Sequence, residues 1–125
     1  MILGVGIDII EVDRIRQAWR QHGERFLHRI LLQAEADYCS TQSDPGPSLA
    51  ARFAAKEAVS KAFGTGIGAA LGWHDIEVLR QPSGQPQILL HGKGARLLQE
   101  RGGRLVHLSL SHSAGQAVAM AILES

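Results

Sequence analysis

One segment restricts the possible folds of this chain more strongly than the rest: a run of small and apolar residues at 49–63 that contains six alanines and no proline. Alanine has the highest helix propensity, so this composition predicts a helix. Ser48 is the expected N-cap, and Gly64 is expected to end the helix in the left-handed conformation. Because most of its circumference is small or apolar, we expect the helix to be packed on several sides.

The remaining sequence predicts shorter elements before and after this helix. Before it, apolar spacing indicates a strand at 2–10 and three helical stretches at 11–22, 26–31 and 34–39. After it, the spacing indicates a hairpin at 76–90, a short helix at 94–101 and a second hairpin at 105–123. This order favours an α+β fold with a mainly antiparallel sheet packed with helices. With 125 residues, the chain is expected to form a single domain over residues 1–125.

The composition excludes several classes of protein. Hydrophobic residues make up 45% and charged residues 20% of the chain, as in an ordinary globular protein. A net charge of +1 and an aromatic content of 5% argue against a general nucleic-acid binder. The single cysteine, Cys39, excludes an internal disulfide and suits a reducing compartment. The longest apolar run, residues 117–123, is too short to cross a membrane, and no signal peptide is recognisable, so we expect a cytoplasmic protein.

Glu57 and Lys61 are the first candidates for chemistry. They lie one turn apart on the predicted helix and therefore share a face. Two interpretations stay open: a solvent-exposed ion pair, or charges on a packed helix that need partners. Asp8 ends an otherwise apolar strand, where it either caps the next helix or binds a ligand. Two such carboxylates would suit Mg²⁺, which usually takes one or two carboxylates together with waters and substrate phosphates.

A polar sequence at the end of the predicted strand 105–112 is the next candidate: Ser109-Leu-Ser-His112, followed by Ser113. It is either a polar strand terminus or a place where hydroxyl and imidazole groups bind phosphate. A serine hydrolase is disfavoured because the chain has no Gly-x-Ser-x-Gly sequence. The glycine-rich loop at residues 64–68 follows a helix and lacks a Lys-Ser/Thr pair, so it is neither a Rossmann fingerprint nor a Walker A loop.

The first helical region carries excess positive charge. Residues 13–30 have a net charge of +3, from Arg14, Arg16, Arg20, Arg25 and Arg29 against Asp13 and Glu24. These arginines are either a solvated helix face or a docking surface for an acidic partner, because guanidinium geometry favours carboxylates and phosphates.

Together, these sequences resemble one family closely. Gly4-Val-Gly-Ile-Asp8, the segment 52–61, the segment 63–68 and Ser109-Leu-Ser-His112 are similar to the motifs of the holo-[acyl-carrier-protein] synthases, the small bacterial type of 4′-phosphopantetheinyl transferase. The motifs occur in order over nearly the whole chain, and the Phe-x-x-Lys-Glu-x-x-x-Lys sequence with the upstream Gly-x-Asp is highly specific. The segments 33–48 and 72–81 carry little of the resemblance.

The resemblance implies Mg²⁺-dependent transfer of 4′-phosphopantetheine from coenzyme A to a serine of apo acyl carrier protein, with release of adenosine 3′,5′-bisphosphate, in support of fatty acid biosynthesis. It also implies the transferase fold of that family and a homotrimer with active sites at the subunit interfaces. By position in the motifs, Asp8 and Glu57 correspond to metal ligands, and Glu57 and Lys61 to catalytic residues. The expected contacts to coenzyme A are Arg52, Lys61, Gly64, Gly66, His112 and Ser113, and those to the acidic carrier protein are Arg14, Arg16, Arg20 and Arg25.

Some alternatives remain open at this level. The general base for the serine hydroxyl is Glu57, a metal-bound water or a carboxylate such as Asp37. A second candidate function is a Mg²⁺-dependent hydrolase of a nucleotide pyrophosphate. A third is a non-catalytic module that uses the arginines to bind an acidic protein or RNA. We expect neither nucleic acid nor membrane to be a partner of the transferase itself.

Overall fold

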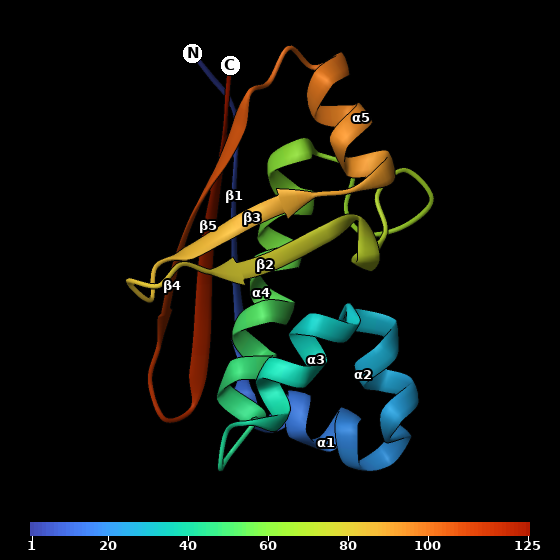
Figure 1. Ribbon diagram of the computed structural model, residues 1–125, viewed down its shortest axis with the longest axis vertical. Helices are drawn as coiled ribbons and strands as arrows, with labels where there is room; N and C mark the ends of the chain where they lie inside the picture. Colours follow the sequence, from blue (N-terminus) through green and yellow to red (C-terminus); the bar gives the residue numbers. More distant parts are fainter.

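The three longest strands form one antiparallel sheet in the computed structural model, which describes residues 1–125 (Figure 1). The strands are β1 (Ile2–Glu11), β4 (Leu105–His112) and β5 (Gln116–Glu124), with β5 in the centre. Asp8 of β1 and Leu110 of β4 are both paired with Ala119 of β5. The N- and C-terminal segments of the chain therefore lie side by side, and the β1 and β4 edges of the sheet are separated by one strand.

Helix α4 (Gly46–Phe63) packs directly on one face of this sheet. The approach is close because β1 carries glycines there: a Cβ at Gly4 would lie 2.1 Å from the Ala62 carbonyl oxygen, and one at Gly6 would lie 1.9 Å from that of Ala58. The central strand contributes three fully buried alanines to the same contact, Ala117, Ala119 and Ala121, followed by the buried Leu123. Small residues on both partners thus bring the two backbones together.

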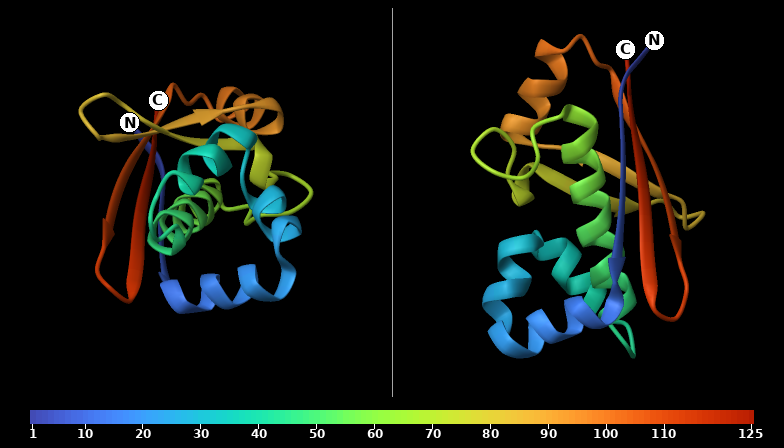
Figure 2. Two further views of the ribbon diagram at one scale, coloured as in Figure 1. Left: turned by 60° about the horizontal axis from the view of Figure 1, so that its bottom comes forward. Right: turned by 180° about the vertical axis from the view of Figure 1, so that it is seen from behind.

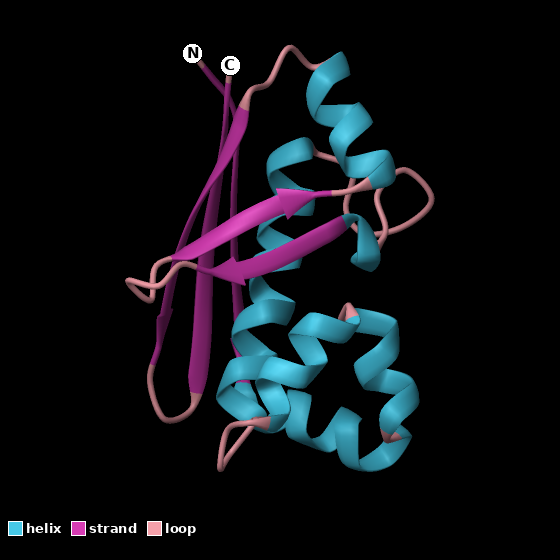
Figure 3. Cartoon of the chain, in the orientation of Figure 1, coloured by secondary structure: helices cyan, strands magenta, loops and turns pink.

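The other elements enclose α4 on its remaining sides (Figures 2 and 3). Helices α1 (Val12–His22), α2 (Glu24–Ile30) and α3 (Gln33–Ser40) surround its N-terminal half. A two-stranded antiparallel sheet of β2 (Ile76–Arg80) and β3 (Pro86–Leu90) follows the 3₁₀ turn η1 (Trp73–Asp75), and α5 (Gly92–Glu100) comes next. The prediction of a helix packed on several sides in an α+β fold is confirmed. No helix is both long and apolar enough to cross a membrane.

The predicted start of α4 is wrong, whereas its predicted end is confirmed. The helix begins at Gly46 with Pro45 at the N-cap position, so Ser48 lies inside the first turn. Pro47 is compatible with that turn because its missing N–H would have no helical partner there. The Ser48 hydroxyl instead accepts a hydrogen bond from Arg52 Nη1 at 2.8 Å. Gly64 ends the helix at φ 78°, in the left-handed region.

The second face of the three-stranded sheet is covered by no element of the chain (Figure 2). Its apolar side chains are open to solvent: Val5, Ile7 and Ile9 are 58–60% exposed, and Met120 is 39% exposed. Val118 and Ile122 of the central strand, paired with Ile9 and Val5, are half-buried. We call this surface the open sheet face. Such a contiguous apolar surface is typical of an interaction site.

Candidate functional site

Asp8, Glu57 and Lys61 lie together where β1 passes the second half of α4. Lys61 Nζ donates to Asp8 Oδ1 and to the Ile7 carbonyl oxygen, both at 3.0 Å. The ion pair is therefore Lys61–Asp8 rather than the solvated Glu57–Lys61 pair considered from the sequence. Asp8 also makes no cap for α1, whose N-cap position is Glu11 and has no side-chain hydrogen bond. The close packing of β1 on α4 explains both results, since it places Asp8 beside the helix.

The electrostatics of Glu57 show that the two carboxylates influence each other. Burial raises the pKa of Glu57, the negative charge of Asp8 raises it further, and Lys61 opposes both effects. Two carboxylates in a partly buried site repel each other when both are ionised. A cation bound between them would relieve that repulsion.

The donor set fits Mg²⁺ and does not fit a closed metal cage. No group of three or more His, Cys, Asp or Glu side chains is placed to hold a metal ion. Asp8 and Glu57 offer only hard carboxylate oxygens, and Mg²⁺ is commonly bound by one or two carboxylates with its other positions taken by waters and substrate phosphates. Structural zinc, by contrast, requires four ligands that are largely Cys and His.

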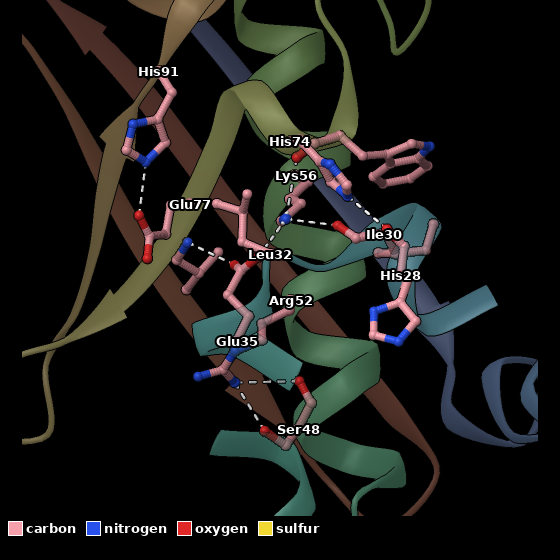
Figure 4. Close-up of polar contacts among 12 residues, drawn as sticks. His28, Ile30, Leu32, Glu35, Ser48, Arg52, Lys56, His74, Glu77 and His91 are labelled. Atoms are coloured by element: carbon pink, nitrogen blue, oxygen red, sulfur yellow. Dashed lines mark hydrogen bonds and ion pairs between the residues drawn. The ribbon is translucent and has the colours of Figure 1, made fainter. Parts of the chain in front are cut away.

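Arg52 and His112 line a separate candidate binding site, a cavity of about 440 Å³ on the β4 side of α4. Arg52 is only 5% exposed, and its Nη1 donates to Ser48 Oγ (Figure 4). Its Nε is buried and has no hydrogen-bond partner within the chain. An unpaired buried N–H is costly and rare in folded proteins, which makes Arg52 a candidate functional residue.

One chain does not gather all the predicted contacts to coenzyme A. Arg52 and Glu57 point about 140° apart around α4, so the helix separates the Asp8–Glu57–Lys61 cluster from the cavity lined by Arg52 and His112. Gly64 and Gly66 follow the C-terminal end of α4, about 18 Å along the helix axis from Arg52. Ser113 is exposed in the β4–β5 hairpin at the other end of the sheet. The roles assigned to these residues stay predictions.

The arginines of the first helices differ in their surroundings. Arg14, Arg20 and Arg25 are exposed and form no ion pair, so their charge is free for a partner. Arg16 is half-buried and binds Asp13 Oδ1 at 3.0 Å and also the Asp44 carboxylate. Its charge is therefore already neutralised within the chain.

The buried pair of Lys56 and Glu35 was not predicted from the sequence (Figure 4). Lys56 Nζ donates to Glu35 Oε1 at 2.7 Å and to the carbonyl oxygens of Ile30 and Trp73 at 2.7 and 3.1 Å. Glu35 also accepts from the backbone N–H groups of Leu32 and Val78, each at 2.8 Å. Burial lowers the pKa of Lys56. The available signal was a lysine on a helix predicted to be packed on several sides, which requires a buried partner.

Comparison with known proteins agrees with the motifs over the whole chain. The family model described as "4'-phosphopantetheinyl transferase superfamily" matches residues 4–121. The holo-[acyl-carrier-protein] synthase of Koribacter versatilis is 52% identical to this chain, and the match covers 99% of this chain and 99% of that protein. The synthase of Chlamydia trachomatis serovar L2 is also 52% identical, and the match covers 98% of this chain and 100% of that protein.

Solved structures give the same result. The holo-[acyl-carrier-protein] synthase of Neisseria meningitidis has a TM-score of 0.94 at 34% identity, with 100% of both chains covered. The Helicobacter pylori synthase in complex with coenzyme A has a TM-score of 0.86 at 32% identity, covering 96% of this chain and 99% of that one. The Bacillus anthracis synthase in complex with CoA (3′,5′-ADP) has a TM-score of 0.85 at 40% identity, covering 100% and 98%.

The chain belongs to the 4′-phosphopantetheinyl transferase superfamily. Within it, the predicted resemblance to the holo-[acyl-carrier-protein] synthases is confirmed, and so is the prediction that the chain is an enzyme of this type. The alternative of a non-catalytic binding module is therefore wrong.

Proposed function

We propose that this enzyme transfers 4′-phosphopantetheine from coenzyme A to a serine of apo acyl carrier protein in a Mg²⁺-dependent reaction that supports fatty acid biosynthesis in the cytoplasm. The observation that carries the proposal is the cluster of Asp8, Glu57 and Lys61, which joins two interacting carboxylates and an ammonium group in one place. Two solved relatives are complexes with coenzyme A or its 3′,5′-ADP part, which supports coenzyme A as the donor.

The proposed reaction requires the protein to neutralise negative charge on the phosphate groups. The serine oxygen forms a bond to the β-phosphorus of coenzyme A, the pyrophosphate P–O bond breaks, adenosine 3′,5′-bisphosphate leaves, and the serine proton passes to a base. Mg²⁺ held by Asp8 and Glu57 would neutralise the phosphate oxygens. Lys61, which is half-exposed beside Asp8, supplies a further positive charge for the leaving phosphate.

Glu57 is the better placed of the two side chains considered as general base. It lies within the cluster, where the charges of Asp8 and Lys61 act on it. Asp37 is exposed on α3, where it accepts a hydrogen bond from Gln33 at 2.8 Å, and α3 packs on the side of α4 away from β1.

A homotrimer would complete the site. The nucleotide contacts at Arg52 and His112 and the Asp8–Glu57–Lys61 cluster lie on different sides of α4, so one chain leaves them apart. The open sheet face, with Val5, Ile7 and Met120 exposed, offers an apolar surface for neighbouring copies. We propose that the open sheet face forms the trimer interface and that each active site takes its cluster from one subunit and its nucleotide contacts from the next.

The acidic carrier protein would dock on α1 and α2. Arg14, Arg20 and Arg25 are exposed there without ion-pair partners, and Arg16 would join them by exchanging Asp13 or Asp44 for a carboxylate of the carrier. Opposite charges of this kind mainly accelerate association and set orientation.

The direct test is mass spectrometry of apo acyl carrier protein incubated with the enzyme and coenzyme A, with and without Mg²⁺. We expect a phosphopantetheine adduct only with Mg²⁺, and a loss of at least about 100-fold in rate for Asp8→Ala and for Glu57→Ala, since each removes one of two metal-binding carboxylates. Absence of the adduct in folded enzyme would refute the transfer. Free phosphopantetheine released without carrier protein would indicate the hydrolase instead, and normal turnover in either variant would refute the metal assignment.

A further inference from the structure

Tyr38 of α3 brings together two arginines from different parts of the fold. The guanidinium carbon of Arg52, on α4, lies 4.5 Å from the centre of the Tyr38 ring. That of Arg80, at the end of β2, lies 5.3 Å from the same ring, and Arg80 Nη1 donates to the Tyr38 hydroxyl. Cation–π contacts of this kind hold a guanidinium in place without neutralising its charge.

The charge of this pair is not compensated within the chain. Neither Arg52 nor Arg80 forms an ion pair with any carboxylate. Three carboxylates line this cavity or the adjoining one, and each already has another partner: Asp44 the Arg16 guanidinium, Glu35 the Lys56 ammonium group, and Glu77 the His91 imidazole. Tyr38 therefore contacts two positive charges that have no carboxylate partner, and such charges favour the binding of an anion.

The cavity gives that anion a place. Arg52, Arg80 and Tyr38 all line the cavity of about 440 Å³, together with His112. The Nε of Arg52 is buried and has no partner within the chain, so this guanidinium keeps unused hydrogen-bonding capacity.

We propose that Arg80 is a second anion-binding residue and that Tyr38 is the positioning residue that holds Arg52 and Arg80 as a pair for a phosphate monoester. A monoester carries a charge of about −1.5 to −2 at pH 7, which matches two guanidinium groups better than the single charge of a diester. This inference rests on the proposed function, in which the monoester is the 3′-phosphate of coenzyme A. The pair then selects 3′-phosphorylated nucleotides over their dephosphorylated forms.

Calorimetric titration of the intact enzyme with adenosine 3′,5′-bisphosphate and with adenosine 5′-monophosphate tests Arg80 without any turnover. We expect wild type to prefer the bisphosphate by about tenfold or more, because one charge-assisted contact is worth that much. Arg80→Gln should lose most of that preference, whereas Arg96→Gln, at an exposed arginine of α5, should keep it. An unchanged preference in folded Arg80→Gln overturns the proposal.

Steady-state kinetics with coenzyme A and 3′-dephospho-coenzyme A test Tyr38. Tyr38→Leu should raise the KM for coenzyme A about tenfold, leave kcat within about twofold and leave the KM for the dephosphorylated donor unchanged, because only the contact to the monoester weakens. Tyr38→Phe, which keeps the ring, should recover most of the lost affinity. Equal changes for both donors would mean that Tyr38 is merely structural. Wild type that transfers nothing from either donor would refute the proposed function, whereas active wild type with unaltered Tyr38 variants would refute only this inference.

Discussion

Glu57 is the residue at which burial and charge conflict most directly. It is on the same helix as Lys61, but Lys61 turns to Asp8, so Glu57 is left beside a second carboxylate in a partly buried place. A residue kept in such surroundings costs stability in the absence of a cation. The conflict is typical of functional sites, where the pKa of an acidic group is commonly raised.

The pH dependence of stability should reveal this conflict. The pKa of Glu57 in the folded state lies above its ordinary value of 4.5, so the folded state holds the proton more tightly than the unfolded state. This contribution is fully present below pH 4.5 and is lost as the pH rises through the folded pKa. Without Mg²⁺, Glu57→Gln should therefore gain stability relative to wild type as the pH rises above 4.5, measured by urea unfolding at fixed protein concentration. Glu100→Gln, at an exposed carboxylate of α5, should show no such trend; a parallel trend in both variants would contradict the assignment.

Lys56 is the reverse case, a buried charge whose partners are all present. Its ammonium group and the Glu35 carboxylate connect the end of α2, the start of α3, α4, η1 and β2. Lys56→Met should lower the free energy of unfolding by about 3–5 kcal/mol, because the buried Glu35 side chain would lose its cation. Adding Glu35→Gln to Lys56→Met should recover part of that loss. A decrease below about 1 kcal/mol in urea unfolding, with no coupling between the two substitutions, would show that water enters the site.

At the scale of elements, the contact between β1 and α4 decides the geometry of the cluster. Gly4 and Gly6 let the strand approach the helix backbone, and Asp8 follows on the same face of β1. The two glycines and the Asp8 carboxylate thus depend on the same contact between β1 and α4. This is a physical reason for the spacing Gly4-Val-Gly-Ile-Asp8.

Gly6→Ala should therefore affect stability and activity together. The new Cβ would lie 1.9 Å from the Ala58 carbonyl oxygen, so β1 must move away from α4. We expect a loss of about 3 kcal/mol in urea unfolding, as for overpacking of a tight core, and a lower transfer rate as Asp8 leaves Glu57. Gly68→Ala is the matched control, since a Cβ at Gly68 would meet nothing within 4 Å and its φ is not positive. Equal effects of the two substitutions would refute the role of the close contact.

The elements were predicted more accurately than their contacts. Helix α4, the β4–β5 hairpin and the left-handed Gly64 follow from local rules, because propensity, apolar period and glycine chemistry act within a few residues. The N-cap was placed wrongly at Ser48 because Pro47 continues the first turn instead of preceding it. The partners of three charged side chains come from distant segments, which no local pattern reveals. Lys61 binds a residue 53 positions away, Lys56 binds one 21 positions away, and Arg52 lies over the ring of Tyr38, 14 positions away.

At the scale of the whole molecule, the sheet has one packed face and one open face. Helix α4 covers the first, while Val5, Ile7, Ile9 and Met120 remain exposed on the second. The predicted contacts to coenzyme A are also divided by α4. Assembly of copies of the chain through the open sheet face would cover these apolar side chains and would also bring the divided contacts together.

Val5→Asp should test that assembly. A carboxylate on the open sheet face would be buried without a partner in a trimer, so we expect light scattering with size exclusion to give the mass of a monomer and the transfer rate to fall strongly. Leu89→Asp, at a 45%-exposed leucine of β3, should leave both unchanged. A trimer that persists in Val5→Asp, or a fully active monomer, would contradict the shared site.

Local propensity and short motifs were enough to predict most of the secondary structure and the family, and they supplied the candidate residues for the site. Which charges meet one another depends instead on the tertiary fold. The same helix face that suggested a Glu57–Lys61 pair carries a lysine bound to Asp8, and the lysine next to Glu57 is buried against Glu35. Hydrogen bonds and ion pairs act over about 3 Å, so they depend on how closely distant segments pack, and here two glycines and a row of alanines set that distance.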